Sequence, residues 1–237
     1  MRRLQASRRL CIIGQRNYMK TAISIAAQLR RVRVVPVIVI DDPALAPSLG
    51  RALSAGGLPC AEVAFRTNGA REALARLAGE CEDVLVGAGT ILTPAQAKDA
   101  RDAGAKFVVA PGFNAAVVDY CLENDIPVFP GIATPTEIEA ALGRGLNVLK
   151  FFPAQALGGI SYLRAIAAPY GGTSFMPTGG ISLQNVNAYL SFPPVVACGG
   201  SWMVPADWIK AGEFDRITAE VSNAVAAVRQ QNGASGS

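Results

Sequence analysis

The segment from Cys60 to Thr90 reads CAEVAFRTNGAREALARLAGECEDVLVGAGT, and its pattern decides the fold. It begins and ends with short runs rich in Val, Ala and Gly, Cys60–Phe65 and Asp83–Thr90, which are typical of buried strands. Between them, Gly69–Leu77 repeats Ala and Leu at helical spacing. A strand, a helix and a second strand in this order predict a parallel βαβ unit.

The same alternation continues along most of the chain. Eight β-type runs follow one another at fairly regular spacing: Val32–Ile40, Cys60–Phe65, Asp83–Thr90, Lys106–Gly112, Pro127–Ile132, Val148–Pro153, Thr173–Gly180 and Pro194–Gly200. Most gaps carry an Ala- and Leu-rich helical pattern, for example Ala44–Ala55, Gly69–Leu77, Pro94–Ala103, Asn114–Glu123 and Thr136–Leu142. Eight such units predict an α/β fold of the (β/α)₈ TIM-barrel type. An N-terminal helix at about Tyr18–Arg30 is expected before the first strand.

An open doubly wound sheet is the alternative to the barrel. Such a sheet requires a phosphate-binding fingerprint after its first strand. The sequence at that point is Ile40-Asp41-Asp42-Pro43, which does not provide one. The pattern therefore favours the barrel.

A single domain is expected from the size of the chain. Its 237 residues, 51% of them hydrophobic, suit one barrel with a large core. We predict residues 1–18 to be a basic, poorly ordered extension, residues 19–231 to form the (β/α)₈ domain and residues 232–237 to form a disordered tail. Met19 opens a more ordinary start than the residues before it, so the role of residues 1–18 is left open.

The formal net charge of +4 conceals an asymmetry along the chain. Residues 1–40 hold nine Arg or Lys residues and no acidic residue, whereas residues 41–237 hold 13 basic and 18 acidic ones and carry a charge of −5. A basic segment can bind nucleic acid or anionic lipid, but this one lacks interleaved aromatic residues and any known motif. No apolar run reaches the roughly 18 residues that a membrane span requires. We therefore expect neither a nucleic-acid nor a membrane partner.

Metal and disulfide chemistry are not indicated. The chain contains no histidine, which removes the commonest general base and the commonest metal ligand. The cysteines are odd in number, widely spaced and without a Cys-x-x-Cys pair: Cys11, Cys60, Cys81, Cys121 and Cys198. This pattern predicts reduced thiols in a cytoplasmic protein, with no metal and no cofactor.

Lys150 is the residue that points most directly to chemistry. It lies in Asn147–Pro153, and it is the only one of the five lysines embedded in an apolar, strand-like run. Burial disfavours the charged ammonium unless it is paired. A neutral lysine amine is a nucleophile for ketones.

Strand parity predicts a partner for Lys150. Side chains alternate between the faces of a strand, so Lys150 shares a face with Val148 and Phe152, and Glu62 shares a face with Ala64 and Arg66. If both faces point inward, an acid and a base lie opposite each other inside the barrel. A structural ion pair is the alternative interpretation, although such pairs are weak evidence for stability.

Other polar or turn-forming residues end the predicted strands. Carboxyl ends of strands form the active-site face of these barrels. Four residues occupy such ends: Arg66, Thr90, Pro111 and Thr178. Arg66 alone is more often a solvated charge at a strand end, and it is the convergence of several polar strand ends that indicates a site.

Two glycine clusters end the last two predicted strands. The sequences are Pro177-Thr178-Gly179-Gly180 and Cys198-Gly199-Gly200-Ser201. Loops after strands 7 and 8 of such barrels commonly bind phosphate through backbone N–H groups. We therefore predict a phosphate site at Gly179, Gly180, Gly199, Gly200 and Ser201, although a single Gly-Gly pair more often marks a turn.

These residues together resemble a known family, the class I 2-keto-3-deoxy-6-phosphogluconate and 4-hydroxy-2-oxoglutarate aldolases. The resemblance runs in order from about Val32 to the C-terminal helix. Matching stretches are Val35–Ile38, Gly56-Gly57, Glu62–Thr67, Val86–Thr90, Ala110–Gly112, Pro130–Ile132, Leu149–Ala154, Pro177–Ile181 and Gly199–Trp202. It implies Lys150 as the Schiff-base lysine and Glu62 as the proton-shuttling acid and base.

The resemblance also implies substrate contacts and an assembly. Arg66 and Thr90 would bind the pyruvyl carboxylate, and Phe152 would shape the pocket. The implied reaction is cleavage of 2-keto-3-deoxy-6-phosphogluconate, as in the Entner–Doudoroff pathway, to pyruvate and glyceraldehyde 3-phosphate without a cofactor. Activity on 4-hydroxy-2-oxoglutarate and a homotrimeric assembly are implied as well.

Some positions depart from the family pattern, and other functions are open. The family often has Thr-Leu at Ala64-Phe65 and Glu at Gln155. The sister aldolase for phosphogalactonate typically lacks an arginine at the position of Arg66. A phosphosugar isomerase or epimerase on the same barrel would not need Lys150. A non-catalytic scaffold would be expected to lose Glu62, Lys150 or the glycine loops.

Overall fold

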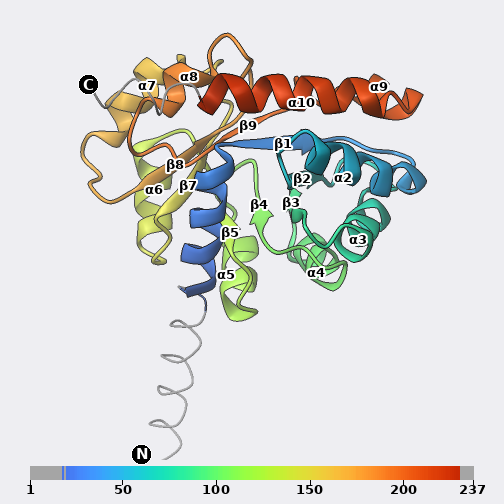
Figure 1. The fold of residues 1–237 in the computed structure, drawn as a ribbon. Helices are drawn as coiled ribbons and strands as arrows, with labels where there is room; N and C mark the ends of the chain where they lie inside the picture. The colour runs from blue at the N-terminus through green and yellow to red at the C-terminus, as the bar shows by residue number, and fades with distance from the viewer. Residues whose placement is uncertain (1–17, 19, 230–237) are drawn as a thin grey trace, which may run out of the picture.

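The computed structural model describes Tyr18 and residues 20–229 (Figure 1). The predicted tail, residues 232–237, and all of the predicted extension except Tyr18 lie outside the described residues. Tyr18 itself is helical and only 5% exposed. Within the described part of the chain, no helix combines the length and the apolar content that crossing a membrane requires.

The strands form the closed parallel arrangement that the sequence predicts. Each of the eight predicted runs contains a strand, and the strands are β1 (Val34–Ile38), β2 (Cys60–Ala64), β3 (Leu85–Gly89), β4 (Val108–Val109), β5 (Val128–Phe129), β6 (Gly131–Ile132), β7 (Val148–Phe151), β8 (Ser174–Pro177) and β9 (Cys198–Gly200). The ladder runs β5-β4-β3-β2-β1-β9 and, separately, β6-β7-β8. Isolated bridges Phe175↔Val195 and Thr178↔Gly199 join β8 to the β9 segment, so the sheet curls into a barrel.

One predicted strand is split by a proline. The run Pro127–Ile132 becomes β5 and β6, separated by Pro130. Proline has no N–H to give to a ladder. Its carbonyl still accepts a 2.9 Å hydrogen bond from the N–H of Lys150, which ties this segment to β7.

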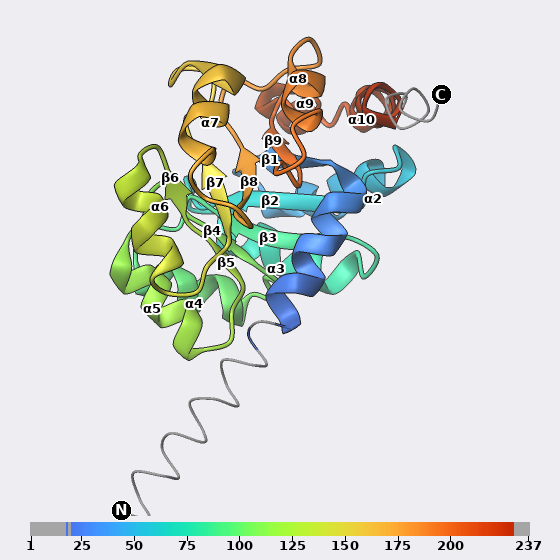
Figure 2. The same ribbon diagram turned by 90° about the vertical axis from the view of Figure 1, so that its left-hand side faces the viewer.

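Helices follow the strands and cover the outside of the barrel (Figures 1 and 2). They are α2 (Ala46–Ala55), α3 (Ala70–Glu80), α4 (Pro94–Asp102), α5 (Ala115–Glu123), α6 (Pro135–Leu142), α7 (Gly159–Ala167), α8 (Val186–Leu190), α9 (Ala206–Ala211) and α10 (Phe214–Arg229), with a short 3-10 turn at Pro43–Leu45. Thr93 and Thr134 cap α4 and α6, each followed by proline in the first turn. The Thr134 cap is completed by Glu137 in a capping box, which fixes where α6 begins.

The predicted N-terminal helix precedes β1, and it closes one end of the barrel. Residues 20–32 are helical, and Ile25 and Leu29 pack into a cluster with residues of the barrel interior such as Phe129 and Met176. The Tyr18 hydroxyl accepts a hydrogen bond from the N–H of Val128, 3.3 Å away. These contacts fill the end of the barrel at which the strands begin, which leaves the opposite end for a site.

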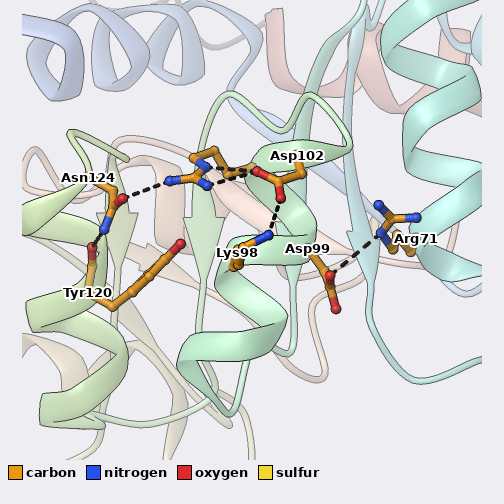
Figure 3. A network of polar contacts seen from close by, with 7 residues as sticks. Arg71, Lys98, Asp99, Asp102, Tyr120 and Asn124 are labelled. Carbon is orange, nitrogen blue, oxygen red and sulfur yellow. Dashed lines mark hydrogen bonds and ion pairs between the residues drawn. The ribbon is translucent and has the colours of Figure 1, made fainter.

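Helices α3, α4 and α5 are joined on the outside by charged and amide side chains (Figure 3). Arg71 approaches Asp99 at 3.7 Å, and Lys98 contacts Asp102 at 2.6 Å. Arg101 donates to both Asp102 and Asn124. These partners are largely exposed, so each pair contributes little to stability. The network belongs to the outer helical layer and not to the barrel interior.

Candidate active site

Lys150 and Glu62 meet inside the barrel, as strand parity predicts. Lys150 Nζ lies 3.3 Å from Glu62 Oε1, and the two residues are 4% and 0% exposed. Their outward neighbours, Val63 and Leu149, pack in the main hydrophobic core instead. Glu62 on β2 and Lys150 on β7 therefore form a pair that is almost completely excluded from water.

Glu62 has an oxygen that nothing in the described structure uses. Oε1 accepts from Lys150, whereas Oε2 is buried without a hydrogen-bond partner. A buried polar atom of this kind calls for an explanation, such as a ligand or a water. One carboxylate oxygen is thus available for proton exchange with a bound molecule.

Gly89 makes room for the Glu62 carboxylate. It pairs with Ala64 in the β2–β3 ladder, so the Glu62 side chain leans over it toward the carboxyl end of the barrel. A Cβ built on Gly89 would lie 2.7 Å from Glu62 Cγ and 2.8 Å from Cδ. Sequence patterns alone do not single out Gly89, because its role depends on the position of a side chain on the neighbouring strand.

Phe152 forms a wall between the lysine and the first glycine turn. Its ring centroid lies 5.2 Å from Lys150 Nζ. A Cβ on Gly179 would come within 3.2–3.3 Å of ring atoms of Phe152. The aromatic face of Phe152 therefore lies next to the amine of Lys150. The prediction that Phe152 shapes the pocket depends on this position.

Arg66 and Thr90 lie together at the ends of β2 and β3. Arg66 Nε donates to Thr90 Oγ1 over 3.2 Å, and Arg66 is exposed. Thr90 has a φ of 60°, which is unfavourable for a β-branched residue. Strain of this kind persists where the surroundings enforce it, often at functional sites. The hydrogen bond fixes the guanidinium at the open end of the barrel.

The two glycine clusters are adjacent in space. Thr178 and Gly199 form a parallel bridge, which brings the ends of β8 and β9 together. Within the described residues, the N–H groups of Gly180 and Ser201 donate no hydrogen bond. Two unused backbone donors and the Ser201 hydroxyl therefore lie at adjoining strand ends.

The other glycines of these clusters are constrained by packing. A Cβ on Gly199 would lie 2.5 Å from Thr178 Oγ1, and a Cβ on Gly200 would collide with the ring of Trp202. Gly200 also pairs with Pro36 of β1. These two glycines support the turn, whereas Gly180 and Ser201 carry the free donors.

Thr178 and Pro111, the other two predicted substrate contacts, both lie against neighbouring residues of the barrel. The Thr178 hydroxyl donates to the Met176 carbonyl over 3.4 Å. Pro111 follows β4, and a Cβ on Gly131 would collide with its carbonyl. Among the described residues, no three His, Cys, Asp or Glu side chains gather in a way that could hold a metal ion.

Comparison with known proteins identifies the class. The model for the family "KDPG and KHG aldolase" matches residues 25–220. A 2-dehydro-3-deoxy-phosphogluconate aldolase of Treponema pallidum is 54% identical over 197 residues, covering 83% of this chain and 94% of the relative. The KHG/KDPG aldolase of Escherichia coli K12 is 44% identical over 192 residues, covering 81% and 90% of the two chains.

A solved structure agrees with this assignment. The KDPG aldolase of Legionella pneumophila, determined with pyruvate captured at low pH as a covalent carbinolamine intermediate, superposes with a TM-score of 0.81 at 40% identity. The alignment covers 84% of this chain and 97% of the other. These similarities place the protein among the aldolases, which are aldehyde-lyases. The chain belongs to the KDPG and KHG aldolase family.

Proposed function

We propose that this protein is a class I aldolase that cleaves 2-keto-3-deoxy-6-phosphogluconate (KDPG) to pyruvate and glyceraldehyde 3-phosphate through a Schiff base on Lys150. The observation that carries the proposal is the buried contact of 3.3 Å between Lys150 Nζ and Glu62 Oε1. A nucleophile within hydrogen-bonding reach of a base is the arrangement that covalent catalysis needs. Membership of the family supports the same chemistry. Action on 4-hydroxy-2-oxoglutarate (KHG) is proposed as a second activity.

Activation of the amine begins the reaction. Transfer of one proton from Lys150 Nζ to Glu62 Oε1, 3.3 Å away, leaves a neutral amine and a neutral carboxylic acid. The neutral amine then attacks C2 of the keto acid. Glu62 returns its proton to the departing oxygen, water leaves, and an iminium ion joins Lys150 to C2.

Cleavage follows from the electron demand of the iminium ion. Glu62, directly or through a water at its unpartnered Oε2, accepts the proton of the C4 hydroxyl. The C3–C4 bond breaks, its electrons form the enamine, and the aldehyde leaves. Protonation of the enamine at C3 and addition of water at C2 release pyruvate and restore the lysine.

Arg66 and Thr90 orient the substrate at one end. A guanidinium binds a carboxylate through two parallel hydrogen bonds. The 3.2 Å contact with Thr90 holds Arg66 in a defined orientation at the barrel mouth. We propose that this pair binds the pyruvyl carboxylate, with Phe152, Pro111 and Thr178 bounding the pocket.

The distal phosphate is assigned to the ends of β8 and β9. The free N–H groups of Gly180 and Ser201 support this assignment. Gly199 lets the two turns approach each other closely, because a Cβ there would contact Thr178, whereas Gly179 and Gly200 leave room for the rings of Phe152 and Trp202. Binding the phosphate far from the reacting carbon positions the C3–C4 bond without taking part in the chemistry.

The family also supports proposals about assembly and location. We propose a homotrimer acting in the cytoplasm on a small keto-acid phosphate. Light scattering on the purified protein measures the mass directly. A monomeric mass would exclude the trimer without affecting the proposed chemistry.

Borohydride trapping tests the proposed function. Incubation with pyruvate and sodium borohydride should add one reduced adduct, and peptide mass mapping should locate it on Lys150. Lys150→Arg keeps the charge but not the nucleophile, so it should give no adduct and no cleavage of KDPG. An adduct on any other lysine, or turnover by the variant, would exclude the Schiff-base assignment.

A further inference from the structure

The loop after β7 docks on the glycine turn after β8 through its backbone. The N–H of Ala154 donates to Thr178 O over 2.8 Å, and the N–H of Gln155 donates to Gly179 O over 3.0 Å. The strand that carries Lys150 is therefore connected directly to the turn that ends β8.

The side chain of Gln155 extends this connection. A Cβ on Gly180 would lie 2.5 Å from Gln155 Cβ, so the side chain packs against the turn. Gln155 Oε1 accepts a 2.9 Å hydrogen bond from the hydroxyl of Tyr189. Tyr189 lies on α8 and is only 1% exposed, which makes it a fixed anchor.

Gly180 depends on such external support. It has a φ of 74° and no side chain of its own to pack. Asn185 Nδ2 donates to Gly180 O over 2.9 Å, and the side chain of Gln155 packs against Gly180. The orientation of the free Gly180 N–H is thus set by its neighbours.

We propose that Tyr189 and Gln155 are positioning residues that hold the Gly179–Gly180 turn in the geometry needed to bind the substrate phosphate. The requirement at position 155 is an acceptor for the Tyr189 hydroxyl, which either a carboxamide or a carboxylate supplies. The inference rests on the proposed function, because it assigns the phosphate to this turn. Neither residue touches the bonds that change.

Four variants separate this role from a general effect on folding. Tyr189→Phe removes the donor, Gln155→Leu removes the acceptor, and Gln155→Glu keeps an acceptor. Tyr170→Phe is the matched control, because it removes an equivalent 2.9 Å tyrosine hydrogen bond, to Glu139, on the protein surface. Each variant is assayed with KDPG and with KHG, which has no phosphate.

The expected outcome is a change in KM for one substrate only. Loss of one neutral hydrogen bond should raise the KM for KDPG by about three- to tenfold in Tyr189→Phe and Gln155→Leu. The kcat/KM for KHG and the yield of borohydride adduct with pyruvate should stay within about twofold in all four variants, since no group that bonds the pyruvyl moiety changes. The Tyr170→Phe control should match the unmodified protein with both substrates. Gln155→Glu keeps the acceptor for the Tyr189 hydroxyl but adds a charge near the turn, so it should be less impaired with KDPG than Gln155→Leu.

Each contrary outcome has a distinct meaning. Equal losses with both substrates, or no loss with KDPG in Tyr189→Phe, would overturn the positioning role. A Gln155→Glu variant as impaired as Gln155→Leu would overturn the requirement for an acceptor. Failure of the unmodified protein to trap pyruvate would instead refute the proposed function, so the two hypotheses fail separately.

Discussion

Gly89 lies so close to Glu62 that a single methyl group there would displace the carboxylate. The Cβ of an alanine at this position would be 2.7 Å from Glu62 Cγ, well inside van der Waals contact. Glu62 is fully buried and cannot move aside into solvent. The position of the proposed acid and base is therefore determined by the absence of a side chain on the neighbouring strand.

Gly89→Ala should reduce kcat by about 100-fold, because a displacement of about 1 Å in a catalytic group has an effect of this size. Steady-state kinetics with KDPG measures the loss. Gly79→Ala is the control, because a Cβ there meets nothing within 4 Å and alanine favours the helix. A Gly89→Ala enzyme within about threefold of the unmodified protein would show that the pair tolerates the shift.

Glu62→Gln should lower kcat by about 10²–10⁴-fold, the usual contribution of a general acid or base. The amide keeps the size of the side chain but cannot exchange the proton. Pyruvate should still form an adduct on Lys150, although more slowly, and rapid-quench borohydride trapping measures that rate. A kcat within about threefold of the unmodified protein, far below the usual acid–base contribution, would mean that Glu62 serves only as a structural partner.

Ser201→Glu should weaken binding of KDPG more than binding of KHG, because a carboxylate next to the proposed phosphate site repels the phosphate of KDPG more strongly than the single distal carboxylate of KHG. An increase in KM of about tenfold is expected for one charge at close range. Ser24→Glu, an exposed residue on the helix at the opposite end of the barrel, changes the net charge equally and is the control. A substitution at Gly180 or Gly200 is a poorer test, because a Cβ there would contact Gln155 or Trp202 before any ligand. Equal effects of Ser201→Glu on the two substrates would place the phosphate elsewhere.

The thiols of Cys60 and Cys121 should be unreactive in the native protein at pH 8. Burial raises the pKa of each to about 12, and Glu62 adds to the effect at Cys60. A raised pKa means that folding favours the protonated thiol, so this stabilisation is present below the unfolded pKa of about 8.5 and is lost as the pH rises toward 12. Iodoacetamide labelling with peptide mapping should modify both residues only in denaturant. Rapid labelling of either one without denaturant would contradict the closed packing of the barrel.

Periodicity in the sequence was enough to predict the barrel and the central pair. All eight predicted runs contain strands, and the parity that placed Lys150 opposite Glu62 is confirmed by their 3.3 Å contact. The extent of the strands was predicted less well. The Lys106–Gly112 run reduces to Val108–Val109, and the Pro127–Ile132 run is interrupted at Pro130.

The supporting contacts of the site could not be predicted in the same way. Gly89 matters because of a side chain on another strand, and Tyr189 because its hydroxyl reaches a loop 34 residues away in the sequence. Local patterns do not encode such distances. They report which face a residue occupies, not which atom it will meet.

The separation of Lys150 and Glu62 along the chain has a practical consequence. The two residues are 88 positions apart and stand on strands from different halves of the barrel. A fragment that ends after α5 would contain the acid without the amine, and the complementary fragment would contain the amine without the acid. Recovery of the pyruvate adduct on mixing two such fragments would thus serve as a reporter of their reassembly, with a background close to zero.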